Sequence, residues 1–508
     1  MYSALICFIV RRVVPVLGAM VFSLCAYADF DLEDWHRYQL DQFVVYSNSD
    51  EDYVQETLTE FLRLKNLVTQ SRQDDLGDSL TPFTVFLFDS RSDFKQLVSN
   101  AHTAGFYTEI DLSPVLVMYK ASRRASIGTH EVLKHEYMHY LVRALSGQNY
   151  PRWYDEGIAE FFSTLEVKRG KLLVGAIPEI RASWLQSGPW SRGGLLPLED
   201  VLDFDVTQSS SDNYIARHYA SSWLLTHYLN LGHLNGFPNR IGQMSNYLHL
   251  VGKGKTSEQA FAEAFDVTLE QMTDEIKQYA GKRRISVLAL QHEEPEFSYK
   301  KTTVSPHAMG MKLYDLVIRR EETASLADEL LKAALASNDP VALAVQANNH
   351  IAAQAFGPAQ TLIETLVDKN LTENRPDVQR LTARAMLGLM SFQPDQAHRL
   401  PVATALLEQA NSKAPHPDTY RMLTEIYWNS KQYQAAIDSA IELGNRMPSS
   451  AYVNFFVGKY LLKARHYDYA AAYLANAANW AHNASLVEDA NRYLKMAQYK
   501  LDEQQASQ

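Results

Sequence analysis

The apolar pattern of this chain changes once, and that change decides what the chain can fold into. Short runs of β-branched and aromatic residues occupy 43–46, 84–88 and 115–119, and a helical pattern covers 51–72. From residue 129 onward helical spacing dominates, and beyond the segment 282–310 no strand signal of any strength appears. Strands that alternate with helices predict a mixed β-sheet, whereas the part beyond that segment can only pack helix on helix. We therefore expect an α+β domain followed by an all-α domain.

The first 28 residues have the layout of a secretory signal peptide. Two arginines precede an apolar run over residues 13–24, and Ala26 and Ala28 supply small side chains at the expected cleavage point. An uncleaved membrane anchor is the alternative. No later stretch approaches 18 uninterrupted apolar residues, so we expect no transmembrane segment after cleavage. The sequence predicts an exported protein, periplasmic or secreted, with cleavage after Ala28.

Cysteine content and charge restrict the chemistry of the mature chain. Cys7 and Cys25 both lie in the signal segment, so a metal bound after cleavage must use histidine, aspartate or glutamate. The chain has 48 basic and 59 acidic residues and a formal net charge of −11. This balance gives no general positive field for a polyanion, and we expect no nucleic-acid partner.

A spacing of 34 residues recurs near the C-terminus. Tyr433 and Ala436 are matched by Tyr467 and Ala470. This period, with small residues where helices would cross, resembles the tetratricopeptide repeat. The resemblance implies an all-α repeat domain whose stacked helices bind a protein partner. An unspecialised helical bundle is the alternative, and the number of repeats before residue 417 stays open.

The strongest chemical signal is an HExxH sequence that begins at His135 and ends at His139. Histidines four residues apart project from one helix face, so both imidazoles can reach one zinc ion. Leu133 and Tyr140 belong to an apolar set on roughly the opposite face, so the buried stripe does not need the histidines. Glu136, beside the first histidine, can take a proton from a zinc-activated water.

A candidate third ligand follows in the segment 151–160, which reads Pro-Arg-Trp-Tyr-Asp-Glu-Gly-Ile-Ala-Glu. With HExxH before it, this segment resembles the gluzincin zinc peptidases, whose next helix carries a ligand glutamate in an aromatic-rich Glu-Gly-x-Ala context. The resemblance implies a Zn²⁺ ligand set of His135, His139 and Glu156. It also implies that Glu136 is the catalytic base and that Glu160 orients a ligand histidine. Solvated helix positions are the alternative for Glu156 and Glu160.

A tyrosine further along is similar to the transition-state tyrosine of aminopeptidase-type gluzincins. That tyrosine stands in a Tyr-x-Lys-Gly setting, whereas Tyr219 is followed by Ala-Ser-Ser, with Ser222 in place of the glycine. The resemblance implies that Tyr219 donates a hydrogen bond to the oxyanion. Tyr214 and His218 are alternates, and a purely structural tyrosine is a further alternative. The family's Gly-x-Met-Glu-Asn segment for a free α-amine is absent, which favours an endopeptidase.

These features together predict an exported zinc metallopeptidase that hydrolyses a peptide or protein substrate. The resemblance implies a thermolysin-like catalytic domain with a mixed β-sheet and active-site helices. The run 115–119, if it is an edge strand, would align an extended substrate. A non-catalytic or chaperone-like scaffold that uses the same fold and repeats for protein interaction is the alternative. The expected organisation is a signal peptide at 1–28, a catalytic domain at 29–284, a linker at 285–310 and a repeat domain at 311–508.

Overall fold

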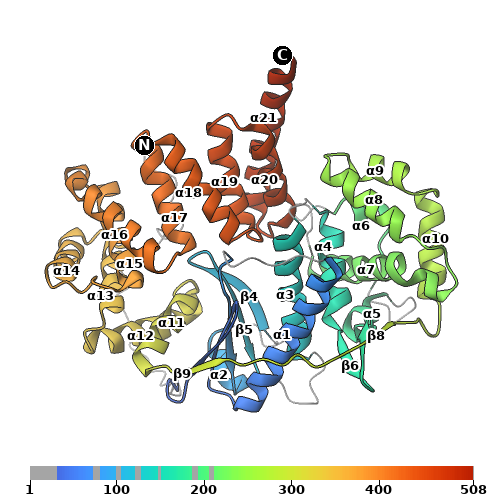
Figure 1. Cartoon of the computed structure of the whole chain (residues 1–508), viewed down its shortest axis with the longest axis horizontal. Coiled ribbons are helices and arrows are strands. Elements are labelled where there is room, and N and C mark those ends of the chain that lie inside the picture. Colours follow the sequence, from blue (N-terminus) through green and yellow to red (C-terminus); the bar gives the residue numbers. More distant parts are fainter. Residues whose placement is uncertain are drawn as a thin grey trace, which may run out of the picture. The chain divides into compact units, whose positions relative to one another are not determined.

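The computed structural model describes residues 31–72, 80–98, 105–120, 128–146, 150–185, 193–204 and 211–506, whose course is shown in Figure 1. The signal segment and its cleavage point lie outside these residues. No helix within the described ranges is long and apolar enough to cross a membrane. The fold is mixed α+β and mostly helical, as expected.

The chain forms two compact units. We call the first the sheet unit; it comprises the described residues of 38–89, 102–300 and 437–508. The second, the helical unit, comprises those of 31–37, 90–101 and 301–436. The last helices of the chain thus belong to the sheet unit. The expected boundaries at 284 and 311 stay predictions, because a compact unit is not the same as a part that folds alone.

The three apolar runs are strands of one sheet, which runs in the order β4-β5-β3-β2-β1 through the sheet unit. The strands are β1 (His36–Leu40), β2 (Phe43–Ser47), β3 (Phe83–Phe88), β4 (Gly105–Ile110) and β5 (Ser113–Tyr119). β2, β3 and β5 are parallel, whereas β4 pairs antiparallel with β5. Residues 115–119 therefore do not meet the condition of an edge position, under which they would align a substrate. β5 lies between two strands, and β4 has one strand neighbour within the described sheet.

Helix α3 (Thr129–Ser146) carries the HExxH sequence and packs its opposite face against the sheet and α1 (Glu51–Arg72). Tyr137 contacts Phe61 and Phe83 edge to face, at ring-centroid distances of 5.0 and 5.3 Å. Leu133 and Tyr140 are buried in the same core. Burial of these side chains fixes the rotation of α3, because turning the helix would expose several large apolar groups to water. The two histidines consequently face away from this core.

Helix α4 (Arg152–Ser163) approaches α7 (Asp212–Leu231) at a glycine. A Cβ atom on Gly157 would lie 2.5 Å from the backbone oxygen of Ser222 and 2.2 Å from Oγ1 of Thr226. Only glycine fits at this crossing, because the Ser222 oxygen belongs to the backbone of a buried helix. This close crossing fixes the position of α4, and with it the position of Glu156, the residue before Gly157.

The remaining elements of the sheet unit surround this core. A second, antiparallel sheet contains β6 (Glu166–Lys168), β7 (Lys171–Val174) and β8 (Leu288–Gln291). The other helices before residue 300 are α5 (Glu179–Leu185), α6 (Leu198–Leu202), η1 (Gly232–Asn235), α8 (Ile241–Gly252), α9 (Ser257–Ala264) and α10 (Leu269–Ala280). The late helices are α18 (Tyr433–Arg446), α19 (Ala451–Lys463), α20 (Tyr467–Trp480) and α21 (Ala484–Ala506), drawn in red tones in Figure 1.

The helical unit consists mainly of successive helices. They are α2 (Arg91–Gln96), α11 (Pro306–Val317), η2 (Glu321–Thr323), α12 (Ala324–Ala336), α13 (Pro340–Ala352), α14 (Phe356–Asp368), α15 (Pro376–Phe392), η3 (Pro394–Arg399), α16 (Leu400–Lys413) and α17 (Pro417–Asn429), with β9 (Lys300–Thr303) before α11. The period seen in the sequence reappears in the helices, since α18 begins at Tyr433 and α20 at Tyr467. Ala436 and Ala470 are both fully buried. The C-terminal region is therefore repeat-like.

Candidate metal centre

Three of the predicted ligands come together between two helices. His135 and His139 project from α3 and Glu156 from α4, and one ligand atom from each lies within 4.8 Å of the others. Nε2 of His139 lies 3.1 Å from Nε2 of His135 and 3.4 Å from Oε2 of Glu156. Within the described ranges, this is the one group of three or more histidine, cysteine, aspartate or glutamate side chains arranged to hold a metal.

The burial of Glu156 and the lack of a hydrogen bond to its Oε2 within the described part of the chain indicate that the cluster suits a cation. Its side chain is 1% exposed, and Oε2 accepts no hydrogen bond from the described residues. A buried carboxylate oxygen without a donor is unfavourable unless a positive charge compensates it. Two imidazoles and one carboxylate also match the ligand set of catalytic zinc sites. The residues present therefore fit Zn²⁺.

The pKa values of His139 and Glu156 also indicate that the cluster favours a cation. Burial alone would lower the pKa of His139, but the carboxylates of Asp155 and Glu156 outweigh it and raise this pKa to about 10. Burial would raise the pKa of Glu156, yet His139 and other basic groups lower it well below its ordinary value. The field at the cluster is thus strongly negative. The same field that favours a proton on His139 favours a bound dication.

Each of the two candidate ligand histidines has a carboxylate within 3.3 Å of its Nδ1. Nδ1 of His135 lies 3.3 Å from Oε1 of Glu160, the carboxylate that the gluzincin resemblance assigned to a ligand histidine. Nδ1 of His139 lies 3.2 Å from Oδ2 of Asp155, a partner that the sequence analysis missed. Such carboxylates fix the ring orientation and the tautomer of a metal-bound imidazole.

The two carboxylates are in turn held by arginines. Arg143 on α3 donates to both oxygens of Asp155, at 3.2 and 2.5 Å. Arg181 on α5 donates from Nε to Glu160 at 2.8 Å. The sequence did not identify these two arginines as site residues. Arg143 could have been found, because it stands four residues after His139 and so lies on the same helix face.

The catalytic candidates share one pocket with the ligands. Glu136 and Tyr219 line a pocket of about 830 Å³ together with all three ligand side chains. The guanidinium of Arg181 lies 5.2 Å from the centre of the Tyr219 ring. The charge of Glu156, followed by burial, raises the pKa of Tyr219 well above its ordinary value. Tyr219 therefore stays protonated at neutral pH and offers a hydrogen-bond donor.

The two alternates for Tyr219 are placed elsewhere. Tyr214 stacks on Phe204 at 5.8 Å, and neither Tyr214 nor His218 is among the pocket-lining residues. His218 is fully buried, stacks on Phe204 at 3.8 Å and lies with Nε2 3.3 Å from the backbone oxygen of Val201. Burial lowers the pKa of His218 to about 4. It is a neutral core residue.

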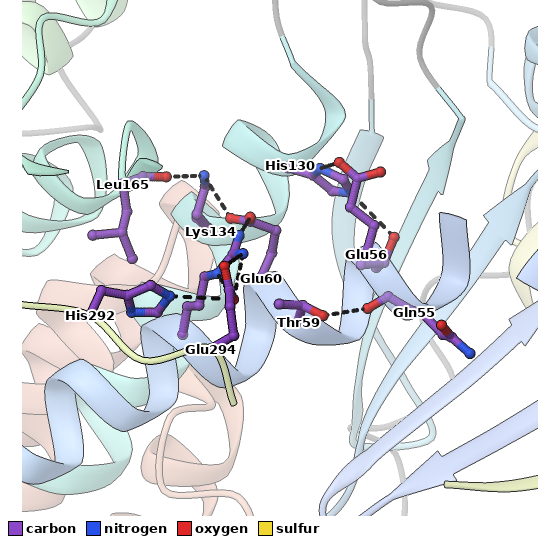
Figure 2. A network of polar contacts seen from close by, with 11 residues as sticks. Gln55, Glu56, Thr59, Glu60, His130, Lys134, Leu165, His292 and Glu294 are labelled. Carbon is purple, nitrogen blue, oxygen red and sulfur yellow. Dashed lines mark hydrogen bonds and ion pairs between the residues drawn. The ribbon is translucent and has the colours of Figure 1, made fainter. Parts of the chain in front are cut away.

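A charged network anchors α3 next to the first ligand (Figure 2). The side chain of Lys134 is almost wholly buried, and Nζ lies 3.1 Å from Oε2 of Glu60 on α1. The same ammonium donates to the backbone oxygen of Leu165, which follows α4. Arg63 joins Glu60 to Glu294, beyond β8. This network connects three segments of the sheet unit around the residue that precedes His135.

Two further walls of the pocket come from parts of the chain far apart in sequence. Gly105 and Tyr107 of β4 line it, so the edge strand borders the site. Ser449, between α18 and α19, and His482, between α20 and α21, line it as well. No signal in the sequence marked His482 as a site residue, because it lies far from the HExxH region and within the repeat pattern.

Comparison with protein-family models gives no match, and no curated protein matches the chain. Among solved structures, one match is a thermophilic TPR protein from Thermus thermophilus. It has 20% sequence identity and covers 37% of this chain and 95% of its own, with a TM-score of 0.30. A score this low supports no argument about fold or function.

Proposed function

We propose that this chain is an exported zinc peptidase, most simply an endopeptidase, that hydrolyses peptide bonds in a peptide or protein substrate. The observation that carries the proposal is the meeting of His135, His139 and Glu156 within 4.8 Å. Glu136 and Tyr219, which line the same pocket, support it further. The thermolysin-like character of the domain is part of the proposal, as is a protein partner bound through the helical repeats.

Each side chain has a task in such a reaction. When bound by the two histidines and Glu156, zinc would polarise the scissile carbonyl and acidify a water molecule. Glu136 takes the proton from the attacking water and passes it to the leaving amine. Tyr219 donates a hydrogen bond to the carbonyl oxygen as negative charge develops there. Arg143 and Arg181 keep Asp155 and Glu160 in place behind the ligand histidines.

The edge strand supplies a way to hold the substrate. β4 borders the pocket through Gly105 and Tyr107 and pairs with β5 on one side. An extended peptide can add to the outer side of such a strand by backbone hydrogen bonds, which are independent of its sequence. The absence of the Gly-x-Met-Glu-Asn segment agrees with binding along a chain rather than at a free terminus.

The test is the Glu136→Gln variant. It keeps the volume of the side chain and all three ligands but removes the base, so we expect zinc content near one per chain and a loss of about 10²–10⁴ in cleavage rate. Rates are measured on a peptide library at matched zinc loading. Glu270→Gln, the same change at an exposed position of α10, is the control.

Two outcomes would contradict this proposal. Equal cleavage by the wild type and Glu136→Gln would reject the role of Glu136. A zinc-loaded wild type that cleaves no peptide in the library would leave the non-catalytic or chaperone-like scaffold as the better reading.

A further inference from the structure

His482 is a pocket residue that the proposed mechanism does not use. It stands between α20 and α21 and lines the same pocket as the ligands and Glu136. It does not belong to the ligand group of His135, His139 and Glu156. His482 keeps some exposed surface, yet the surrounding protein desolvates its ring and lowers its pKa to about 4.

The segment that carries His482 is fixed to the helices of the metal centre. The side-chain amide of Asn479 donates to the backbone oxygen of Tyr150 at 3.3 Å. Trp480 is almost completely buried, and the guanidinium of Arg143 lies 5.5 Å from its ring centre. Arg152, at the start of α4, donates to the backbone oxygen of Ala481. Three consecutive residues before His482 thus contact the α3–α4 region, so the place of His482 at the pocket is determined by packing.

The hydrogen bond with Arg152 determines the tautomer of the His482 ring, that is, which ring nitrogen carries the proton. Nη1 of Arg152 lies 3.3 Å from Nδ1 of His482. A guanidinium has five donors and no acceptor, so Nδ1 must accept this hydrogen bond and carry no proton. In the neutral ring the proton then resides on Nε2. His482 therefore presents a neutral N–H donor at the pocket wall.

We propose that His482 is a catalytic residue that donates its Nε2 proton, as a hydrogen bond, to the substrate carbonyl oxygen on which charge develops. This inference rests on the peptidase function proposed above. His482 would thus be a second hydrogen-bond donor in the pocket, in addition to Tyr219. The C-terminal helical region supplies it, not the segment that carries HExxH. Donors that meet developing negative charge in a partly dry site have large effects on rate.

The first experiment compares His482→Leu with His482→Gln in the full-length, zinc-loaded protein. Leucine removes the donor, so we expect kcat to fall about 10²–10³-fold with little change in KM. Glutamine keeps an N–H donor and is expected to recover part of the loss. His466→Leu, at an exposed position just before α20, is the matched control and is expected to keep the wild-type rate.

The second experiment does not depend on activity. Nitrogen-15 NMR of histidine-labelled protein, with the His482 signals assigned by their loss in His482→Gln, reports which ring nitrogen is protonated. We expect the Nε2–H tautomer in the wild type and a mixture of tautomers in Arg152→Met. Zinc content is expected to be the same in the wild type and all His482 variants.

The outcomes separate this inference from the proposed function. An unchanged kcat in His482→Leu beside an active wild type would overturn the role of His482 alone, and so would an Nδ1–H tautomer. Loss of zinc from His482→Leu would make it a ligand instead of a donor. A wild type without cleavage would overturn the peptidase function and this role with it.

Discussion

Replacing Gly157 by alanine tests whether the α4–α7 crossing positions the metal ligand. The added Cβ would lie 2.5 Å from the backbone oxygen of Ser222. Carbon–oxygen contacts are rarely shorter than about 3.3 Å, so the two helices must separate by about 0.8 Å. Overpacking of this kind costs about 1–3 kcal/mol, and the higher helix propensity of alanine returns up to about 1 kcal/mol. We expect a net loss of about 1–2 kcal/mol and a fall in Tm of about 2–8 °C.

The same displacement should weaken zinc binding. Glu156 is the neighbour of Gly157 in α4, and metal–ligand distances tolerate changes of only about 0.2 Å. Moving the helix should therefore reduce zinc affinity by about tenfold to 100-fold. Thermal unfolding measures the first effect, and competition with a zinc-binding dye measures the second.

Two further variants sharpen the experiment. In Gly242→Ala on α8, the new Cβ would have no neighbouring heavy atom within 4 Å, so stability should stay the same or rise by up to about 1 kcal/mol. Thr226→Ala removes the 2.2 Å contact but leaves the Ser222 oxygen, so it should restore Gly157→Ala only in part. A Gly157→Ala protein with wild-type Tm and zinc affinity would refute the reasoning.

The remaining predictions concern a ligand support and the pH dependence of folding. Asp155→Asn should reduce zinc affinity about 10–100-fold, measured by dye competition, because the carboxylate behind His139 is lost; an unchanged affinity would contradict that role. Burial lowers the pKa of the fully buried His227 to about 4, so the unfolded chain binds more protons below its ordinary value of 6.5. Stability should therefore fall by about 2 kcal/mol from this group between pH 7 and pH 5. In urea unfolding, His227→Gln should remove this part of the fall and leave the part that His218 contributes, since burial lowers the pKa of His218 to about 4 as well.

The local parts of the site could be predicted from the sequence because they follow from helix geometry. The spacing of His135 and His139 and the apolar face opposite them are fixed by the repeat of an α-helix. Glu156 and Glu160 stand four residues apart on the next helix, so their common face was also determined locally. The meeting of the two helices was implied only by the gluzincin resemblance, and the structure brings all four side chains together.

What the sequence could not supply depends on packing between distant segments. The strand pattern of residues 115–119 shows that they are buried, but a buried strand can lie inside a sheet or at its edge. Only the antiparallel pairing of β4 with β5 places the edge at residues 105–110. His482 has no local signal, since its place at the pocket results from contacts of its neighbours with Tyr150, Arg143 and Arg152.

The contact between Arg152 and Ala481 also has a consequence for the order in which the molecule is assembled. These residues are 329 positions apart, and the largest segment of the helical unit, residues 301–436, lies between them in the sequence. Closing so long a loop is entropically costly, and contacts between distant residues form slowly. The wall that carries His482 cannot form until the ribosome has passed residue 482. Between the synthesis of residue 146 and that of residue 482, a nascent chain therefore holds its HExxH helix without a complete pocket.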